Sequence, residues 1–231
     1  MATPWIAADE DVYRAVLGGP QFAAALDDLA ARTGRTKPDL HRDAEAALAE
    51  MAAEITPSAM KLWDRMGKSL TRSYVVDADT STLADLRARN RDHSLVFLPN
   101  HRSYLDPLVL RSVLAKHGFP PNFTLGGINL AKWPISELGK RSGLIFIRRS
   151  TKDDPTYPVV LRLYLGHLLR QHANLEWYFE GGRTRTGKLR PPKMGVLRYL
   201  VDAFVAADAT DGVPDGPADD VFLVPVAIVY D

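Results

Sequence analysis

Short apolar segments alternate with helical segments from Ser94 to the end of the chain, and this alternation constrains the fold more than any other feature. Strands separated by helices predict a largely parallel sheet, because parallel strands need a long crossover and a helix usually supplies it. Functional loops in such sheets follow the carboxyl ends of the strands. We therefore expect an α/β fold whose mixed, largely parallel sheet is flanked by helices. The expected strands are Ser94–Leu98, Phe123–Leu125, Leu144–Ile147, Leu175–Phe179 and Val221–Val229, and the expected helices are Pro107–His117, Pro134–Arg141, Tyr157–Gln171 and Lys193–Ala206.

The first 90 residues differ from the rest, because they are rich in alanine, leucine and charge at helical spacing. We predict helices at Gln21–Arg32, Lys37–Glu54 and Pro57–Tyr74, divided by glycine and proline. This pattern indicates an N-terminal helical appendage at 1–90 and an α/β domain at 91–231. The chain stops directly after the last apolar strand, which leaves little to cover that strand, so we expect the second domain to be incomplete at its C-terminus.

Composition excludes several classes of protein. None of the 231 residues is cysteine, which rules out disulfides, thiolate nucleophiles and cysteine-ligated zinc. A formal net charge of +1 argues against a protein that coats nucleic acid, although local basic patches stay open. The longest uncharged apolar run, 221–230, is too short to cross a bilayer, which takes about 20 residues. We expect any membrane contact to be peripheral.

The predicted helix Pro57–Tyr74 is amphipathic. Its basic side chains fall in one narrow arc at about 100° per residue, and its apolar side chains lie broadly opposite. Two interpretations stay open. The apolar face packs against the protein, which is the commoner arrangement, or it contacts an anionic membrane surface. The basic residues are Lys61, Arg65, Lys68 and Arg72, and the apolar residues are Met60, Leu62, Trp63, Met66 and Leu70.

The loop after the first expected strand contains the first candidate catalytic residues, His101 and Asp106. A histidine beside a carboxylate is a general-base arrangement, because the carboxylate fixes one ring nitrogen and leaves the other free to accept a proton. Five residues on one helix would separate the two side chains by about 140°, so we place His101 in a loop and Asp106 at the start of the following helix. The alternative is structural, because aspartate before Pro107 is a favoured helix N-cap.

Two arginines, Arg148 and Arg149, follow the expected strand Leu144–Ile147 directly. Guanidinium groups offer forked donors to phosphate or carboxylate, so the pair is a candidate anion receptor. Solubility of a sheet edge explains the same pair equally well.

A basic, glycine-containing loop follows the expected strand Leu175–Phe179. Its glycines let the backbone approach a ligand closely, and its cations favour a phosphate. Residues 182–188 match the first seven positions of a nucleotide-binding P-loop, but Leu189 stands where a magnesium-binding hydroxyl is needed, and prolines follow where a helix should continue. We therefore reject the nucleotide-hydrolase interpretation. Glu180 is interpreted as an ion-pair partner of the loop's cations rather than as an acid-base group. The loop contains Gly181, Gly182, Arg183, Arg185 and Lys188.

The order of these segments resembles the glycerolipid acyltransferases and their histidine-x4-aspartate motif. Four blocks carry the resemblance: 100–107, 143–149 (GLIFIRR), 179–187 (FEGGRTRTG) and 224–230 (VPVAIVY). Three features are most similar to the bacterial glycerol-3-phosphate 1-O-acyltransferases and their dihydroxyacetone-phosphate relatives: the His-Arg-Ser start at 101–103, the doubled glycine with the Arg-Thr-Arg-Thr-Gly-Lys that follows it, and the stretch 127–134. Thr184 departs from the serine usual in that family but keeps the hydroxyl. Family members of this type continue well past the fourth block.

The resemblance implies transfer of a fatty acyl group from acyl-CoA or acyl-carrier protein to the sn-1 hydroxyl of glycerol 3-phosphate, giving lysophosphatidate, the first step of phospholipid biosynthesis. In this scheme His101 is the base and Asp106 orients it. Neither a metal nor a cofactor is expected, and nucleic acid is not an expected partner. We expect the chain to work peripherally at the cytoplasmic face of the cell membrane. The expected phosphate-binding residues are Arg148, Arg183, Arg185, Lys188, Gly181 and Gly182, and the expected supporting residues are Arg102, Ser103, Glu180, Arg149 and Pro225.

Two alternatives remain. One is an acyltransferase that acts on dihydroxyacetone phosphate or lysophosphatidate. The other belongs to a different class, a non-catalytic module that binds phosphate or a membrane surface.

Overall fold

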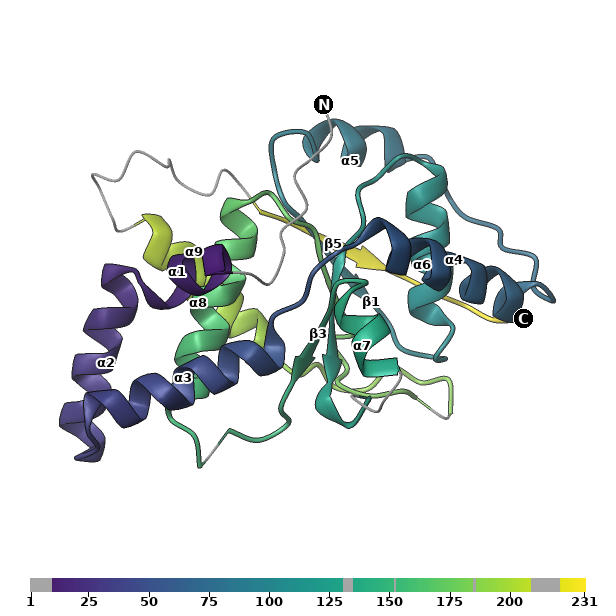
Figure 1. The fold of residues 1–231 in the computed structure, drawn as a ribbon. Coiled ribbons are helices and arrows are strands. Elements are labelled where there is room, and N and C mark those ends of the chain that lie inside the picture. Colours follow the sequence, from purple (N-terminus) through teal and green to yellow (C-terminus); the bar gives the residue numbers. More distant parts are fainter. Residues whose placement is uncertain (1–9, 131–134, 152, 185, 209–220) are drawn as a thin grey trace.

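The five strands among the described residues form one sheet. The computed structural model describes the chain except residues 1–9, 131–134, 152, 185 and 209–220 (Figure 1). The strand order is β3-β2-β4-β1-β5, and each neighbouring pair is parallel. The expected α/β class is therefore confirmed, with only parallel pairings among the described strands. The strands are β1 (Leu95–Pro99), β2 (Phe123–Gly127), β3 (Leu144–Ile147), β4 (Leu175–Trp177) and β5 (Phe222–Val226).

Helices cover both faces of this sheet. In Figure 1, α1, α2, α3, α8 and α9 lie on one side of the sheet, and α4 and α6 lie on the other. Strand β1 is buried on both sides, because Val96 packs into the core under α3 and α8 while Leu95 and Phe97 pack against α6. The helices are α1 (Glu10–Leu17), α2 (Pro20–Thr33), α3 (Lys37–Met51), α4 (Pro57–Thr71), α5 (Leu83–Arg89), α6 (Asp106–Lys116), the 3-10 turn η1 (Ile128–Leu130), α7 (Ile135–Lys140), α8 (Thr156–Arg170) and α9 (Gly195–Asp208).

One hydrophobic core crosses the boundary expected near residue 90. Leu48 and Met51 of α3 are fully buried in the same cluster as Leu165 of α8 and Val96 of β1. The hydroxyl of Tyr164 accepts a hydrogen bond from the backbone amide of Ala53 at 3.0 Å, which ties the end of α3 to α8. The N-terminal helices therefore form part of the layer that covers the sheet.

Helix α4 is only partly covered by the protein. Gly67 lies against Leu108 of α6, and Ala59 is buried. Three residues of the predicted apolar face nevertheless stay in solvent, since Leu62, Met66 and Leu70 are 52%, 36% and 52% exposed. Inward packing, the commoner arrangement, therefore accounts for only part of this face.

The strand order decides which loops meet. Because all strands are parallel, their carboxyl ends share one edge of the sheet. Strand β1 lies between β4 and β5, so the loop with His101 is flanked by the segments that follow those two strands. Strand β3 lies at the far edge of the sheet, beyond β4 and β2.

Candidate active site

His101 and Asp106 are in direct contact. Nδ1 of His101 lies 2.9 Å from Oδ2 of Asp106, and the aspartate is fully buried. The same oxygen accepts the backbone amides of Arg102 and Ser103 at 2.7 and 2.9 Å, so the carboxylate also closes the loop between the two residues. Because Nδ1 faces the carboxylate, Nε2 is the ring nitrogen available to take a proton.

The expected N-cap role of Asp106 is corrected by this geometry. Helix α6 begins at Asp106 and has Leu105 at its N-cap position. The carboxylate accepts hydrogen bonds from the loop before the helix instead of from amides of the helix itself. Asp106 thus serves the histidine and the loop with the same oxygen.

The other oxygen of Asp106 accepts a hydrogen bond from the hydroxyl of Tyr230 at 2.7 Å. Asn100 holds this C-terminal segment in place, because its side-chain amide both donates to and accepts from the backbone of Ile228. Burial acts to raise the pKa of Asp106, but the hydrogen bonds it accepts outweigh burial and hold that pKa below its ordinary value. The carboxylate therefore stays charged beside His101 at neutral pH. Sequence reasoning quoted the segment of Tyr230 but gave this residue no role.

Glu180 connects the two loops in a way that differs from the predicted ion pair. Its side chain is buried, and its two oxygens accept the backbone amides of His101 at 3.0 Å and Arg190 at 2.9 Å. Glu180 is therefore a brace between the histidine loop and the far end of the basic loop.

Further contacts fit the basic loop against the histidine loop. The amide of Thr184 donates to the carbonyl of His101 at 2.9 Å. Gly187 has φ +76°, and a Cβ there would lie 2.9 Å from Nη1 of Arg102. Gly181 has φ +66°, and its missing side chain leaves room for Lys193. These glycines are needed for a left-handed backbone and for close packing.

Arg183 places a positive charge over the ring of Tyr104, which is a neighbour of the histidine. Its guanidinium lies 3.7 Å from the ring centre of Tyr104, and that ring centre is 6.5 Å from the centre of the His101 ring. Among the described residues, neither Arg183 nor Lys188 forms an ion pair with a carboxylate. Both line a cavity of about 410 Å³ beside Thr184. Arg185 lies outside the described residues, as do residues 131–134 of the stretch used for the family resemblance.

Arg148 is not part of this cluster, which corrects its predicted phosphate-binding role. Its guanidinium forms ion pairs with Glu50 and Asp154, both at 2.7 Å, and lies over the ring of Tyr157. It follows β3, which is three strand spacings, or roughly 14 Å, from β1. Arg148 therefore joins α3 to the loop before α8.

The supporting residues are divided between the site and the scaffold. Arg149 follows Arg148 after β3, but its Nε lies near Gly127 at the end of the neighbouring strand β2. Ser103 accepts the amide of Leu105 in the histidine loop. Pro225 lies in the edge strand β5 and pairs with Leu98 of β1. Proline has no amide hydrogen to donate, which an edge strand tolerates. We therefore assign Pro225 to the scaffold.

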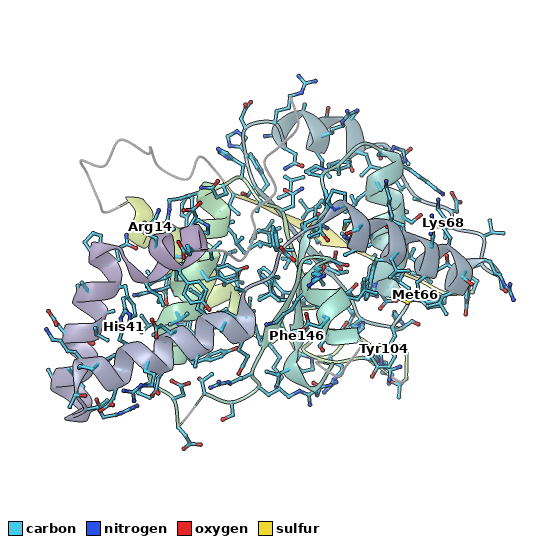
Figure 2. All side chains as sticks on the ribbon, viewed as in Figure 1. Arg14, His41, Met66, Lys68, Tyr104 and Phe146 are labelled. Atoms are coloured by element: carbon cyan, nitrogen blue, oxygen red, sulfur yellow. The ribbon has the colours of Figure 1, made fainter. Side chains whose placement is uncertain are left out.

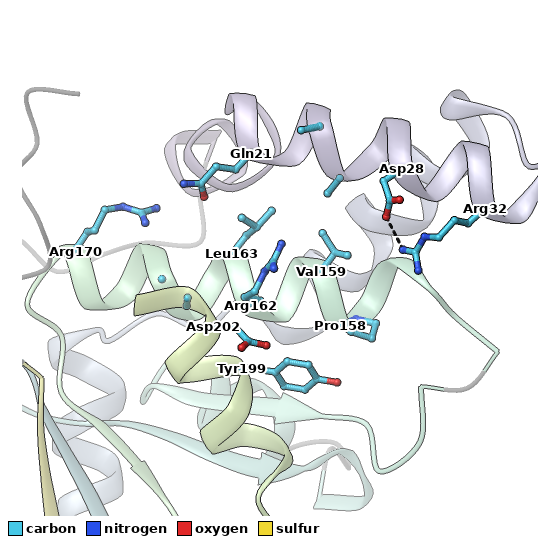
Figure 3. Close-up of a pocket in the computed structure, with 14 residues that line it drawn as sticks. Gln21, Asp28, Arg32, Pro158, Val159, Arg162, Leu163, Arg170, Tyr199 and Asp202 are labelled. Carbon is cyan, nitrogen blue, oxygen red and sulfur yellow. Dashed lines mark ion pairs between the residues drawn. The ribbon is translucent and has the colours of Figure 1, made fainter. Parts of the chain in front are cut away.

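A separate hollow of about 490 Å³ lies between α2, α8 and α9 (Figure 3). Arg162, Tyr199 and Asp202 are among its lining residues. None of the predicted site residues lines it, so we do not regard it as the active site.

The described part of the site is a histidine-aspartate pair at the carboxyl edge of a parallel sheet, beside a loop whose Arg183 and Lys188 have no carboxylate partner among the described residues. Comparison with known proteins identifies the class of enzyme. The Acyltransferase family model matches residues 81–229, and the chain belongs to that family. Two similar curated proteins are "Putative acyltransferase plsB1" from Mycobacterium bovis and its namesake from Mycobacterium tuberculosis. Each is 41% identical over 226 residues, which cover 98% of this chain and 35% of the relative. The chain thus spans about a third of the length of these relatives.

No helix within the described ranges is both long and apolar enough to cross a membrane. In that same part of the chain, no three histidine or acidic side chains gather as a metal-ligand set.

Proposed function

We propose that this chain transfers a fatty acyl group from acyl-CoA or acyl-carrier protein to the sn-1 hydroxyl of glycerol 3-phosphate, giving lysophosphatidate as the first step of phospholipid biosynthesis. The observation that carries the proposal is the contact of His101 with Asp106 beside a loop whose cations Arg183 and Lys188 have no described carboxylate partner. Membership of the acyltransferase family supports the reaction type.

The reaction needs one base and no protein nucleophile. Nε2 of His101 takes the proton of the hydroxyl, and the alkoxide oxygen attacks the thioester carbonyl. The tetrahedral intermediate collapses with loss of the thiolate, which receives the proton from the imidazolium and leaves as a thiol. Asp106 stabilises the imidazolium while it exists.

The phosphate of the acceptor fits the cationic loop. Arg183 and Lys188 supply charge, and the Nε of Arg102 is buried without a hydrogen-bond partner in the described structure. A buried donor without an acceptor is costly, and a phosphate oxygen would satisfy it. Fixing the phosphate holds the hydroxyl at attack distance, which removes an entropic barrier of up to about 7 kcal/mol.

The direct test measures thiol release from acyl-CoA with glycerol 3-phosphate, dihydroxyacetone phosphate or lysophosphatidate as the acceptor. We expect release that depends on glycerol 3-phosphate. Preference for another acceptor would correct the substrate. Absence of release with all three, together with phosphate binding, would favour the non-catalytic module.

The role of Arg183 has its own test. Arg183→Ala should raise KM for glycerol 3-phosphate at least about tenfold, the loss expected for a charge-assisted hydrogen bond, and leave KM for the acyl donor nearly unchanged. Arg198→Ala on the exposed side of α9 is the matched control. Equal effects on both substrates would contradict the phosphate role.

We further propose that α4 rests on an anionic membrane surface, so that the chain works peripherally at the cytoplasmic face of the membrane. The exposed apolar stripe of Leu62, Met66 and Leu70 is flanked by the exposed cations Lys61 and Arg65. This arrangement is typical of interfacial helices. Figure 2 shows Met66 and Lys68 at the end of the molecule that carries Tyr104, the neighbour of His101.

The segment after α4 also reaches the site, because the ring of Tyr74 packs edge-on against Tyr230, which binds Asp106. A bilayer under α4 would therefore lie near the catalytic pair, where an acyl chain must enter or leave.

Sedimentation with vesicles tests this surface. Lys61→Glu with Arg65→Glu, and separately Leu62→Gln with Leu70→Gln, should each weaken binding to phosphatidylglycerol-containing vesicles, since each nearby cation contributes about 1 kcal/mol. Arg32→Glu with Arg42→Glu makes the same charge change on α2 and α3 and serves as the control. Unchanged sedimentation would contradict the proposal. Self-association that the leucine substitutions abolish would assign the face to a second copy.

A further inference from the structure

An aromatic side chain lies against the candidate catalytic imidazole. The ring centres of Tyr178 and His101 are 4.2 Å apart, with 39° between the ring planes. Tyr104 approaches the same imidazole from another direction, at 6.5 Å and 73°. The histidine is thus held by a hydrogen bond at one nitrogen and by an aromatic ring close to it.

Tyr178 is itself held by a buried carboxylate. Its hydroxyl donates to Oε1 of Glu176 at 3.0 Å, and the side chain of Asn122 donates to Oε2 at 3.2 Å. Glu176 is 1% exposed and lies in β4, between β1 and β2 in the sheet. Residues two apart on a strand share a face, so Glu176 and Tyr178 both lie opposite the core formed by Leu175 and Trp177.

A carboxyl group at the centre of a parallel sheet is costly to bury, and an apolar residue would cost less. Burial raises the pKa of Glu176 to about 7. Burial also raises the pKa of Tyr178, which keeps its hydroxyl protonated as a donor. Glu176 bonds to a residue that touches His101, which gives the buried group a use beyond packing.

We infer that Tyr178 is a positioning residue for His101, and that Glu176 acts by holding Tyr178 in place. The bond from Nδ1 to Asp106 fixes one point of the imidazole but still lets the ring tilt about that bond. Contact with Tyr178 removes this freedom, so the two restraints together set the direction of Nε2. This inference rests on the proposed function, in which His101 is the base.

A purely structural interpretation makes different predictions. If Tyr178 and Glu176 only stabilise the sheet, their removal lowers the melting temperature and the amount of folded enzyme, but the folded fraction keeps its kcat and its pH profile. If Tyr178 positions the imidazole, kcat of the folded enzyme falls. Loss of an aromatic face beside an imidazolium also moves the acid limb of the pH profile to lower pH, since that face favours the charged ring.

The experiment compares Tyr178→Leu and Tyr178→Phe with Tyr164→Leu and Tyr164→Phe. Tyr164 is a matched control, because it is a buried tyrosine whose hydroxyl bonds only to the backbone of Ala53 among the described residues, in the core under α3 and α8. We expect Tyr178→Leu to lower kcat by roughly 10- to 100-fold, the cost of a misplaced catalytic group. The acid limb should move down by about 0.4 to 0.7 pH unit. Tyr178→Phe keeps the ring and should lose less than Tyr178→Leu.

Glu176 is tested by a conservative and a disruptive change. Glu176→Gln keeps an oxygen for Tyr178, and Asn122 can turn its amide to match because its Oδ1 has no partner in the described structure. We expect Glu176→Gln to retain most of kcat and Glu176→Ala to lose it in parallel with Tyr178→Phe. Equal losses in both Glu176 variants would contradict a role through Tyr178.

NMR of the His101 ring separates this inference from the proposed function. The ring resonances, identified by their absence from His101→Gln, should move in Tyr178→Leu and stay in place in Tyr164→Leu. If they move as expected but the wild type transfers no acyl group, the proposed function fails and the contact stands. If the wild type is active and Tyr178→Leu loses no more kcat than Tyr164→Leu, the positioning role is overturned.

Discussion

Replacement of Asp106 by asparagine and by alanine should separate its two tasks. In Asp106→Asn, the remaining oxygen should face Arg102 and Ser103, because an amide nitrogen there would meet their backbone N–H groups. The new NH₂ would then face the hydroxyl oxygen of Tyr230, which can accept. The loop therefore keeps its hydrogen bonds while the site loses a charge. Asp106→Ala instead leaves both backbone amides without an acceptor, at about 1 to 3 kcal/mol each.

The expected magnitudes differ accordingly. Urea denaturation should show a loss of about 2 to 5 kcal/mol in unfolding free energy for Asp106→Ala and less than about 1 kcal/mol for Asp106→Asn. Thiol-release assays should show kcat/KM reduced about 10- to 10³-fold in Asp106→Asn, because the imidazolium that forms during the reaction loses its buried counter-charge. An asparagine variant as unstable as the alanine variant, or one within about threefold of wild-type activity, would refute this reasoning.

Three further changes have expected outcomes. The unfolding free energy of wild type should fall by up to about 3 kcal/mol as pH rises from about 4.5 to 7. The reason is that Glu176 keeps its proton up to about pH 7 in the folded protein but loses it near pH 4.5 in the unfolded chain. Glu176→Gln should lack this dependence on pH. Arg148→Ala should lower Tm in calorimetry by several degrees, because it leaves Glu50 unpaired. The same change should alter KM for glycerol 3-phosphate by less than about twofold. A rise in this KM like that of Arg183→Ala would return Arg148 to the phosphate site. Tyr230→Phe should lower kcat about 2- to 10-fold with little change in Tm, and an unchanged kcat would remove Tyr230 from the site.

Sequence reasoning predicted the sheet well because the signal for each strand is local. All five expected strands are present, and β3 has the predicted bounds of Leu144–Ile147. The expected strands at 175–179 and 221–229 were too long, because apolar residues continue past the last ladder pairing into the loops. Helix α5 was missed, since its seven residues bury no side chain and give no apolar periodicity.

Direct contacts within the site were predicted where the two partners lie close in sequence. His101 and Asp106 are five residues apart, and the motif itself places them in one turn. Arg148 was assigned to the phosphate because its partner Glu50 lies 98 residues away and only the tertiary fold brings them together. Tyr230 lies 124 residues from Asp106, so its hydrogen bond became visible only once the order of β1 and β5 was known.

For helix α4 the sequence left two interpretations of the apolar face open, packing against the protein or contact with a membrane. In the structure, part of the helix is packed and part is exposed. Gly67 lies against α6 and Ala59 is buried, whereas Leu62 and Leu70 stay exposed beside the cations. Helical periodicity gives the apolar arc but not the width that the neighbouring helix covers. The membrane contact therefore stays a prediction with a defined surface.

The central claim is that His101 is the base that activates the acceptor hydroxyl. It is tested most directly by thiol release from acyl-CoA in the presence of glycerol 3-phosphate, with wild type and His101→Ala at equal folded concentration by circular dichroism. Loss of a general base should reduce the acceptor-dependent rate by about 10²- to 10⁴-fold. A His101→Ala enzyme that retains this rate within about tenfold of wild type would contradict the claim.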